Sequence, residues 1–283
     1  MARLPPATPA GRRSSLLEGI HRLIAASESG APGFPPTLIY NEGWMLRLIL
    51  DWFSRNPVPG HLLTFEPGAQ WFSEGLLPSP FRARHRSDAR AEARTHADGL
   101  VGHFAIGSAA KADATLLPDA TQLLVLEAKI SSALSAGTRN APAYDQAARS
   151  VACIAQMHQM AGRSPGDMTS LGFFVLAPGS FIQAGVFASK LDKGSIEAAV
   201  SERAQLFQAE LPTWLDDCFR PTLGAMHIEA LSWEDLLAEI EAHDTASSST
   251  LHAFYEQCLK HNTRSSKSLP TGLGAVELAG END

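Results

Sequence analysis

The feature that most constrains the fold is an apolar run, residues 121–130, that ends in the triplet Glu127-Ala128-Lys129. The run contains leucine and valine but no glycine or proline, which is typical of a strand buried on both faces. Side chains alternate along a strand, so the odd-numbered residues from 123 to 129 share one face. The sequence therefore predicts a face that is apolar at its start and ionic at its end.

Two readings of this ionic end remain open from the triplet alone. Burying Glu127 and Lys129 is costly unless another group pairs with them, and a divalent metal and a phosphate would be suitable partners. The alternative is a strand end that is simply solvated. The triplet is the only acid-x-Lys sequence in the chain, and it ends the most strand-like segment. These two facts favour a functional site.

A second acid lies upstream, in Asp98-Gly99, and an apolar run at 100–106 follows it. An Asp-Gly pair favours a turn, so we expect a turn at Asp98 and a strand over 100–106. A purely structural turn aspartate is the alternative. The separation from Glu127 leaves room for a hairpin with a long connection.

An aspartate at one strand, a loop and a second strand ending in Glu-x-Lys resemble the PD-(D/E)XK phosphodiesterase superfamily. The resemblance covers roughly residues 37–190. It implies an α/β class with a restriction-endonuclease-like core: a helix, a three-stranded meander, a helix and a fourth strand, here followed by extra C-terminal helices. The proline that often precedes the family's aspartate is replaced by Ala97.

The same resemblance implies roles for the residues that match the motif. Asp98 and Glu127 would be metal ligands, and the backbone carbonyl of Ala128 would add a third. Lys129 would stabilise charge in the transition state or position the attacking water. The implied cofactor is Mg²⁺, with Mn²⁺ as a substitute, because both prefer hard oxygen ligands.

Two predicted helices carry further candidates. Asn41 is a good N-cap for a helix over 42–53, which matches the first core helix. In many members of the superfamily this helix carries an acid that faces the metal, so Glu42 is a candidate; the alternative is that Glu42 complements the helix dipole.

A later helix, over 143–160, places Gln146 and Arg149 one turn apart. One branch of the superfamily has a glutamine here with a tyrosine four positions on, where this chain has Ser150. Gln146 and Arg149 are candidates for orienting the substrate or the carboxylate of the metal site. An ordinary surface face is the alternative.

Composition limits how the chain can bind a polyanion. It has 283 residues, 45% of them hydrophobic, a net charge of −7 and a pI of about 5.8. A dedicated nucleic-acid binder is more often basic, so contact with DNA requires a local basic patch or a partner. The one candidate patch precedes Asp98 and can attract phosphates, although a solvated loop is the alternative. Its arginines are Arg82, Arg84, Arg86, Arg90 and Arg94.

Other features predict location and organisation. The three cysteines have no disulfide or zinc spacing, which fits a reducing, cytoplasmic location, and no apolar run is long enough to span a membrane or serve as a signal core. Beyond the core we expect a strand at 170–178, helices over 196–219 with a break at Pro212, and helices at 232–240 and 251–259. The predicted parts are a tail with a short helix at 1–36, the core at 37–190, a helical extension at 191–262 and a disordered tail at 263–283.

The sequence thus predicts a metal-dependent nuclease that hydrolyses phosphodiester bonds, most simply in DNA and in a restriction, defence or repair role. The alternative is a catalytically inactive nucleic-acid-binding or assembly subunit with the same fold. A homodimer or a partner protein is compatible with either. An unrelated α/β protein would place Asp98 far from Glu127.

Overall fold

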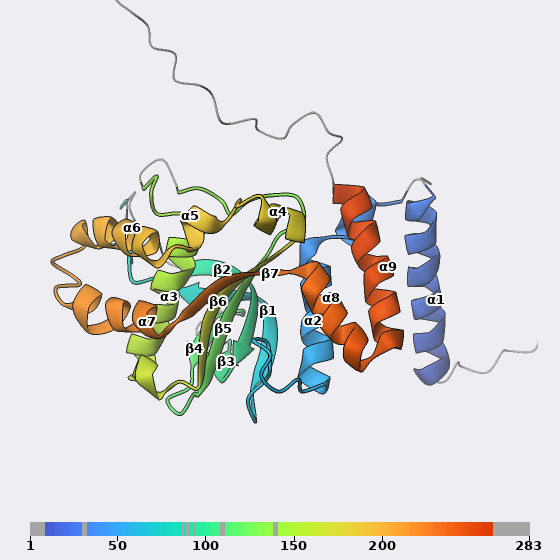
Figure 1. Ribbon diagram of the computed structural model, residues 1–283, viewed down its shortest axis with the longest axis horizontal. Coiled ribbons are helices and arrows are strands. Elements are labelled where there is room, and N and C mark those ends of the chain that lie inside the picture. The colour runs from blue at the N-terminus through green and yellow to red at the C-terminus, as the bar shows by residue number, and fades with distance from the viewer. Residues whose placement is uncertain are drawn as a thin grey trace, which may run out of the picture.

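The computed structural model is an α/β structure built on a mixed five-stranded sheet with helices on both faces (Figure 1). The predicted tail at 263–283 and Arg90 lie outside the residues that the structure describes. Within those residues, no helix is long and apolar enough to cross a membrane. The described residues are 9–29, 33–86, 88, 91–92, 94–107, 111–137 and 141–262.

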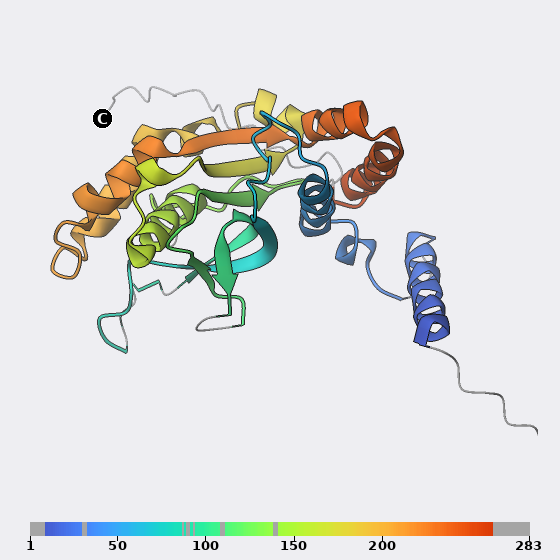
Figure 2. The same cartoon turned by 90° about the horizontal axis from the view of Figure 1, so that it is seen from below.

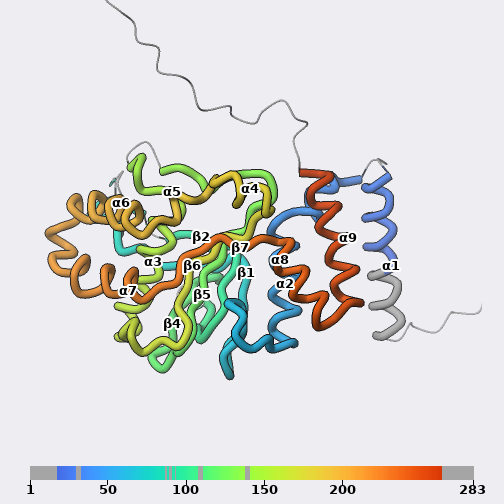
Figure 3. The backbone as a smooth tube through the Cα atoms, in the orientation of Figure 1, coloured from blue at the N-terminus to red at the C-terminus, as the bar shows by residue number. Residues whose placement is uncertain are grey.

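The sheet has the strand order β1-β2-β5-β6-β7, and a small hairpin of β3 and β4 is inserted between β2 and β5. The strands β1, β2 and β5 form an antiparallel meander, whereas β5, β6 and β7 run parallel to one another. The chain path can be followed in Figure 3. The strands are β1 (Gln70–Pro78), β2 (Arg94–Gly102), β3 (Phe104–Ile106), β4 (Ala114–Leu116), β5 (Gln122–Ala128), β6 (Ser170–Ala177) and β7 (His227–Ser232).

Strand β5 lies at the centre of the sheet and is buried along its whole length, as predicted. Its two faces serve two hydrophobic cores. Leu123 and Val125 belong to the core beneath α3 (Gln146–Ala161). Leu124 and Leu126 belong to the core beneath α2 (Glu42–Arg55). The alternation expected from the sequence is confirmed.

The α2 core is completed by the two C-terminal helices, α8 (Trp233–His243) and α9 (Thr245–Asn262). Asn41 is the N-cap of α2, as predicted, and Ser232 is the N-cap of α8. The Asn41 side chain accepts a hydrogen bond from the backbone N–H of Trp44, and Ser232 accepts one from Asp235. Figure 2 shows that α1 (Pro9–Glu28), which includes the predicted short helix, stands beside this group rather than against the sheet.

The α3 core is covered by α3 and by the helices between β6 and β7. Asp145 caps the start of α3, and Gly162 ends it in the left-handed conformation. The remaining elements are η1 (Pro36–Leu38), η2 (Pro165–Asp167), α4 (Gly179–Gln183), α5 (Ala188–Leu191), α6 (Lys193–Gln205), the π-helical turn η3 (Leu215–Phe219) and α7 (Arg220–Ala225).

The structure corrects several predictions. Asp98-Gly99 lies inside β2 and is not a turn, because the strand begins at Arg94 and pairs on both sides. The segment expected to be one strand over 100–106 is divided at His103 between β2 and β3. The long connection expected between the Asp98 strand and the Glu127 strand contains β4, and the edge strand β7 was not predicted at all.

Candidate active site at the end of strand β5

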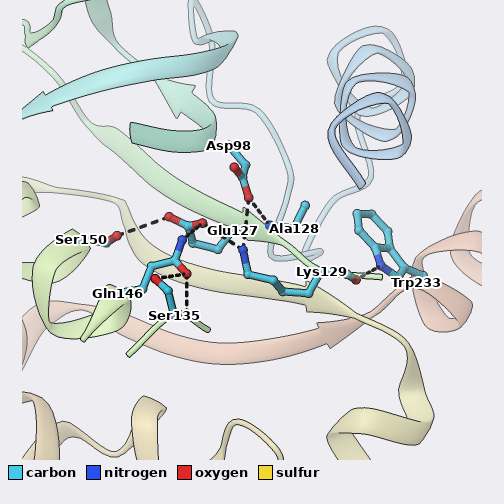
Figure 4. Close-up of polar contacts among 8 residues, drawn as sticks. All are labelled: Asp98, Glu127, Ala128, Lys129, Ser135, Gln146, Ser150 and Trp233. Carbon is cyan, nitrogen blue, oxygen red and sulfur yellow. Dashed lines mark hydrogen bonds and ion pairs between the residues drawn. The ribbon is translucent and has the colours of Figure 1, made fainter. Parts of the chain in front are cut away.

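The three residues of the predicted motif meet at one point in the structure (Figure 4). The Lys129 Nζ lies 3.7 Å from Asp98 Oδ2 and 3.6 Å from Glu127 Oε2. They meet because β2 and β5 are antiparallel neighbours in which Gly99 pairs with Leu126, so the next positions along the two strands are Asp98 and Glu127. The reading of Glu127 and Lys129 as a merely solvated strand end is therefore wrong.

A local reversal of the pleat aims Asp98 at β5. In the β1–β2 ladder, Ser73 pairs with Gly99, and Gly75 pairs with Ala97. In a regular ladder these two pairs would share a face, because they are two residues apart. Ser73 instead lies on the α2 side, where its hydroxyl accepts a hydrogen bond from Arg47 Nε at 2.8 Å.

The pair of Gly75 and Ala97 lies on the opposite, α3 side. Ala97 belongs to the α3 core, and a Cβ on Gly75 would lie 2.4 Å from Leu100 of the same core. The reversal coincides with Glu74, whose φ of 59° is the one positive value at a non-glycine position in the described chain. Asp98 lies opposite this residue, and its Oδ2 accepts a hydrogen bond from the Ala128 N–H at 2.8 Å.

Glu127 is fully buried, and two side chains from the first turns of α3 hold its carboxylate. Gln146 Nε2 donates to Oε2 at 2.6 Å, and the Ser150 hydroxyl donates to Oε1 at 3.4 Å. Burial raises the pKa of Glu127 well above its ordinary value, and the adjacent Asp98 carboxylate raises it further, while Lys129 lowers it. The site is thus arranged to receive positive charge beside Glu127.

The loop that follows β5 positions Gln146 in turn. The Gln146 Oε1 accepts hydrogen bonds from the backbone N–H of Ser135 at 3.0 Å and from its hydroxyl at 3.3 Å. Both ends of the Gln146 amide are therefore engaged, and its role as a support of Glu127 is visible in Figure 4. An ordinary surface position for Gln146, the alternative from the sequence, is wrong.

Lys129 is held through its backbone. Its N–H donates to the carbonyl of Leu176 in β6 at 2.8 Å, and its carbonyl accepts from the indole N–H of Trp233 at 2.9 Å. Trp233 is the first residue of α8 and is fully buried. Neither Trp233 nor Ser150 was predicted from the sequence to support the site. The position of Ser150, one turn after Gln146, was a usable signal, whereas Trp233 had none.

The donor groups fit a magnesium site. Mg²⁺ in proteins is usually bound by one or two carboxylates, with waters and substrate oxygens completing an octahedron. Asp98 and Glu127 supply two carboxylates, and a cation between them would oppose both the burial and the Asp98 repulsion that raise the pKa of Glu127. The Ala128 N–H points at Asp98, and the carbonyl of the same strand residue points to the same side.

Glu42 is not brought to this pair. It lies in the first turn of α2, and its carboxylate is one of the groups, after burial, that raise the pKa of the Cys258 thiol to about 12. Nowhere in the part of the chain that the structure describes do three or more His, Cys, Asp or Glu side chains gather to hold a metal. A third protein carboxylate at the site is therefore not supported.

The candidate arginines are largely engaged with the protein itself. Arg84 pairs with Asp88, donates to the carbonyl of Leu206 and lies over the ring of Phe207. Arg94 pairs with Asp113, and Arg149 lies 3.3 Å from Glu92. Arg82 and Arg86 are exposed. Of the four cluster arginines that the structure describes, Arg82 and Arg86 are thus the two whose charge faces solvent.

Comparisons with known proteins add no relative to these observations. No protein-family model and no curated protein matches the sequence, and no solved structure matches the fold. The function must therefore be inferred from the residues at the end of β5 themselves.

Proposed function

We propose that this protein is a metal-dependent nuclease that hydrolyses phosphodiester bonds in DNA. The observation that carries the proposal is the convergence of Asp98, Glu127 and Lys129 within ion-pair distance at the end of a buried strand. Two acids and a lysine form a costly cluster in a protein interior, and such clusters are characteristic of functional sites.

The order of elements supports a restriction-endonuclease-like core. The helix α2, the meander of β1, β2 and β5, the helix α3 and the strand β6 follow one another as the PD-(D/E)XK resemblance implies. The β3–β4 hairpin and the strand β7 would be additions to that core. The proposal also places Asp98, Glu127 and Lys129 on the strands where the superfamily carries its motif.

The protein's own residues have separate roles in this proposal. Asp98, Glu127 and the Ala128 carbonyl would hold the Mg²⁺. When bound, the metal supplies polarisation of the scissile phosphate and lowers the pKa of the attacking water. The Lys129 ammonium stabilises the negative charge that develops on the phosphate.

Three features of the protein keep these groups in place. Gln146 and Ser150 fix the orientation of the Glu127 carboxylate through one oxygen each. The backbone of Lys129 is tied to β6 and to Trp233, so the ammonium extends from a fixed point. Such support holds the reacting groups in their working geometry before substrate binds.

The pairing of Arg84, Arg94 and Arg149 with the chain's own acids favours one alternative, an inactive nucleic-acid-binding or assembly subunit. In that case the same fold would bind DNA, or assemble with a protein partner, without cleaving it. A cleavage assay separates the two functions.

The test combines metal binding with cleavage in matched variants. Mg²⁺ or Mn²⁺ should raise the melting temperature of the parent, because a ligand that binds only the folded state stabilises it. Asp98→Asn and Glu127→Gln should abolish most of this shift and all cleavage. Asp216→Asn, which changes a carboxylate on the exposed π-helical turn, is the control and should retain both.

Lys129→Ala separates the catalytic role from the structural one. It should keep the metal-dependent shift but lose cleavage of plasmid, linear duplex and single-stranded DNA by about 10²–10³-fold, as expected for one electrostatic donor. Cleavage by Lys129→Ala at the parental rate would overturn the nuclease assignment. An identical metal shift in Asp98→Asn would overturn the metal site.

A further inference from the structure

An exposed aromatic platform lies on the helix next to the candidate active site. Trp44, in the first turn of α2, has 42% of its surface exposed, whereas Trp52, Trp214 and Trp233 are buried. The Arg47 guanidinium lies over the Trp44 ring, 5.1 Å from its centroid. We call Trp44 and Arg47 the indole platform. A large exposed aromatic held by a neighbouring cation has the form of a stacking surface rather than of a core residue.

The Arg47 guanidinium that covers Trp44 is also bonded to β1. Arg47 Nε donates to the Ser73 hydroxyl at 2.8 Å, and its Nη2 lies 3.3 Å from Glu74 Oε1. The guanidinium is therefore held by β1 on one side and by the indole on the other. A side chain that is already ordered loses little conformational entropy when a ligand stacks beside it.

The anchoring residues lie directly across the ladder from the active-site strand. Ser73 pairs with Gly99, and Glu74 is opposite Asp98 in the same register. Asp98 is the proposed metal ligand, so the platform is attached to β1 at Glu74, which is opposite Asp98, and at Ser73, which pairs with the adjoining Gly99. The platform and the proposed metal ligand are therefore connected through neighbouring residues of β1 and β2.

One strained residue links the two sites. Glu74 has a φ of 59°, a conformation that costs a residue with a side chain about 1–3 kcal/mol and that is concentrated at functional sites. The pleat reversal at Glu74 has two results. It turns Asp98 toward the Ala128 N–H, and it carries the Glu74 carboxylate to Arg47. The same backbone distortion thus builds the metal ligand and the support of the platform.

The chemistry of the platform favours an unpaired base. Every nucleobase has a flat π-face that stacks on an aromatic side chain, and this mode needs neither a base sequence nor a large positive charge. Arg47 is already paired with Glu74, so the platform adds little attraction for phosphate. Bases inside a duplex are stacked on each other and cannot use it. This mode of binding also suits a chain whose net charge is −7.

We propose that the indole platform stacks an unpaired base of the substrate, so that the enzyme acts on single-stranded DNA or on a single-stranded end. This inference rests on the proposed nuclease function and specifies the substrate class of that site. Trp44 is then a substrate-binding residue beside the catalytic group formed by Asp98, Glu127 and Lys129.

The experiment measures binding of a short oligothymidylate and of a duplex hairpin of equal length, by fluorescence anisotropy without added metal. Trp44→Ala should weaken oligothymidylate binding by about 5–150-fold, the loss expected for one base stack. Trp44→Phe should recover most of the affinity because it restores an aromatic face. Hairpin binding should change little in either variant.

Leu117→Ala, which removes an exposed apolar side chain between β4 and β5, is the matched control and should bind both ligands like the parent. In the parent, oligothymidylate should also quench the fluorescence of Trp44, and Trp44→Phe should lose that quenching.

The proposal is overturned if Trp44→Ala binds oligothymidylate as tightly as the parent, if it loses affinity for the hairpin equally, or if the parent does not bind the single strand. These outcomes differ from a failure of the proposed function. A parent that binds through Trp44 but never cleaves DNA supports the platform and refutes the nuclease. A parent that cleaves DNA, but whose affinity for the single strand does not depend on Trp44, supports the nuclease and refutes the platform.

Discussion

At the scale of single residues, the backbone angle of Glu74 has consequences on both of its sides. Its left-handed conformation reverses the pleat where β1 faces Asp98. An amino acid with a Cβ in this conformation is destabilised by about 1–2 kcal/mol, whereas glycine adopts it freely. The strain at Glu74 therefore lowers the stability of the protein, while the pleat reversal that it accompanies orients Asp98 on the neighbouring strand β2.

This strain predicts that glycine at position 74 gives a more stable protein than alanine does, the reverse of the usual order in a strand. Glu74→Gly should be more stable than Glu74→Ala by about 1 kcal/mol, because both lose the Arg47 ion pair but only alanine keeps the strain. The difference should appear as about 2–4 °C in melting temperature. At Glu229, on the exposed side of the ordinary strand β7, alanine should be the better residue. Alanine being superior at both positions would show that Glu74 is not strained.

Single residues also show how much of the candidate site could be predicted from the sequence. Glu127 and Lys129 follow from the alternation of one buried strand, and their convergence with Asp98 follows from adding the superfamily resemblance. The turn expected at Asp98-Gly99 was wrong because local Asp-Gly propensity is overridden by strand pairing on both sides. Ser150 and Trp233 reach the site through tertiary packing alone, for which a single sequence carries no period or motif.

At the scale of elements, the two ends of α3 have different roles. Its first turns present Gln146 and Ser150 to the candidate active site. Its last turn contains His158, whose Nδ1 lies 3.2 Å from the carbonyl of Arg163, just past the Gly162 cap. Burial lowers the pKa of His158 from its ordinary value of 6.5, so folding favours the neutral imidazole.

The lowered pKa of His158 predicts an acid-sensitive helix end. In the range between its folded pKa and 6.5, the unfolded chain binds more protons than the folded one, so the free energy of unfolding increases with pH. This contribution is complete above 6.5 and is lost as the pH falls through the folded pKa. Urea unfolding between pH 5 and 8 should show a shallower pH dependence in His158→Gln than in the parent.

His21→Gln, which changes an exposed histidine of α1, is the control and should keep the parental slope. A smaller slope remains in all variants, because burial also lowers the pKa of His61. Equal slopes in His158→Gln and the parent would contradict a neutral, buried imidazole.

Elements with strong local patterns were predicted well, and those without them were not. The cap at Asn41 and the apolar strands β5 and β6 carry local signals, and the structure confirms them. Strand β7 is half exposed at the sheet edge, so it lacks both the apolar run of a buried strand and a turn pair beside it. The β3–β4 hairpin has only three residues in each strand, too few to show alternation.

At the scale of the whole molecule, two cores share one sheet. Leu223 of α7 belongs to the core beneath α3, and Leu251 of α9 belongs to the core beneath α2. Strand β5 contributes to both cores through its alternating side chains. The described chain should therefore unfold as one cooperative unit rather than as a core and a separate extension at 191–262.

Leu223→Ala and Leu251→Ala test this coupling. Each should destabilise the protein by about 2–5 kcal/mol, the usual result of removing a buried leucine side chain. In each variant, far-ultraviolet and near-ultraviolet circular dichroism should follow a single shared transition. Glu256→Ala, on the exposed side of α9, should melt like the parent. Two separate transitions in Leu251→Ala would instead identify the C-terminal helices as an independent unit.

The hydrogen bond from Trp233 to the carbonyl of Lys129 also orders events during synthesis on the ribosome. A nascent chain acquires structure from its N-terminus as it emerges. All three motif residues leave the ribosome well before Trp233 does. Until α8 and α9 follow, the core beneath α2 lacks the side chains of these two helices, and the backbone of Lys129 lacks its indole partner. A translation product that stops short of residue 233 would therefore contain the whole motif without the packing that fixes it.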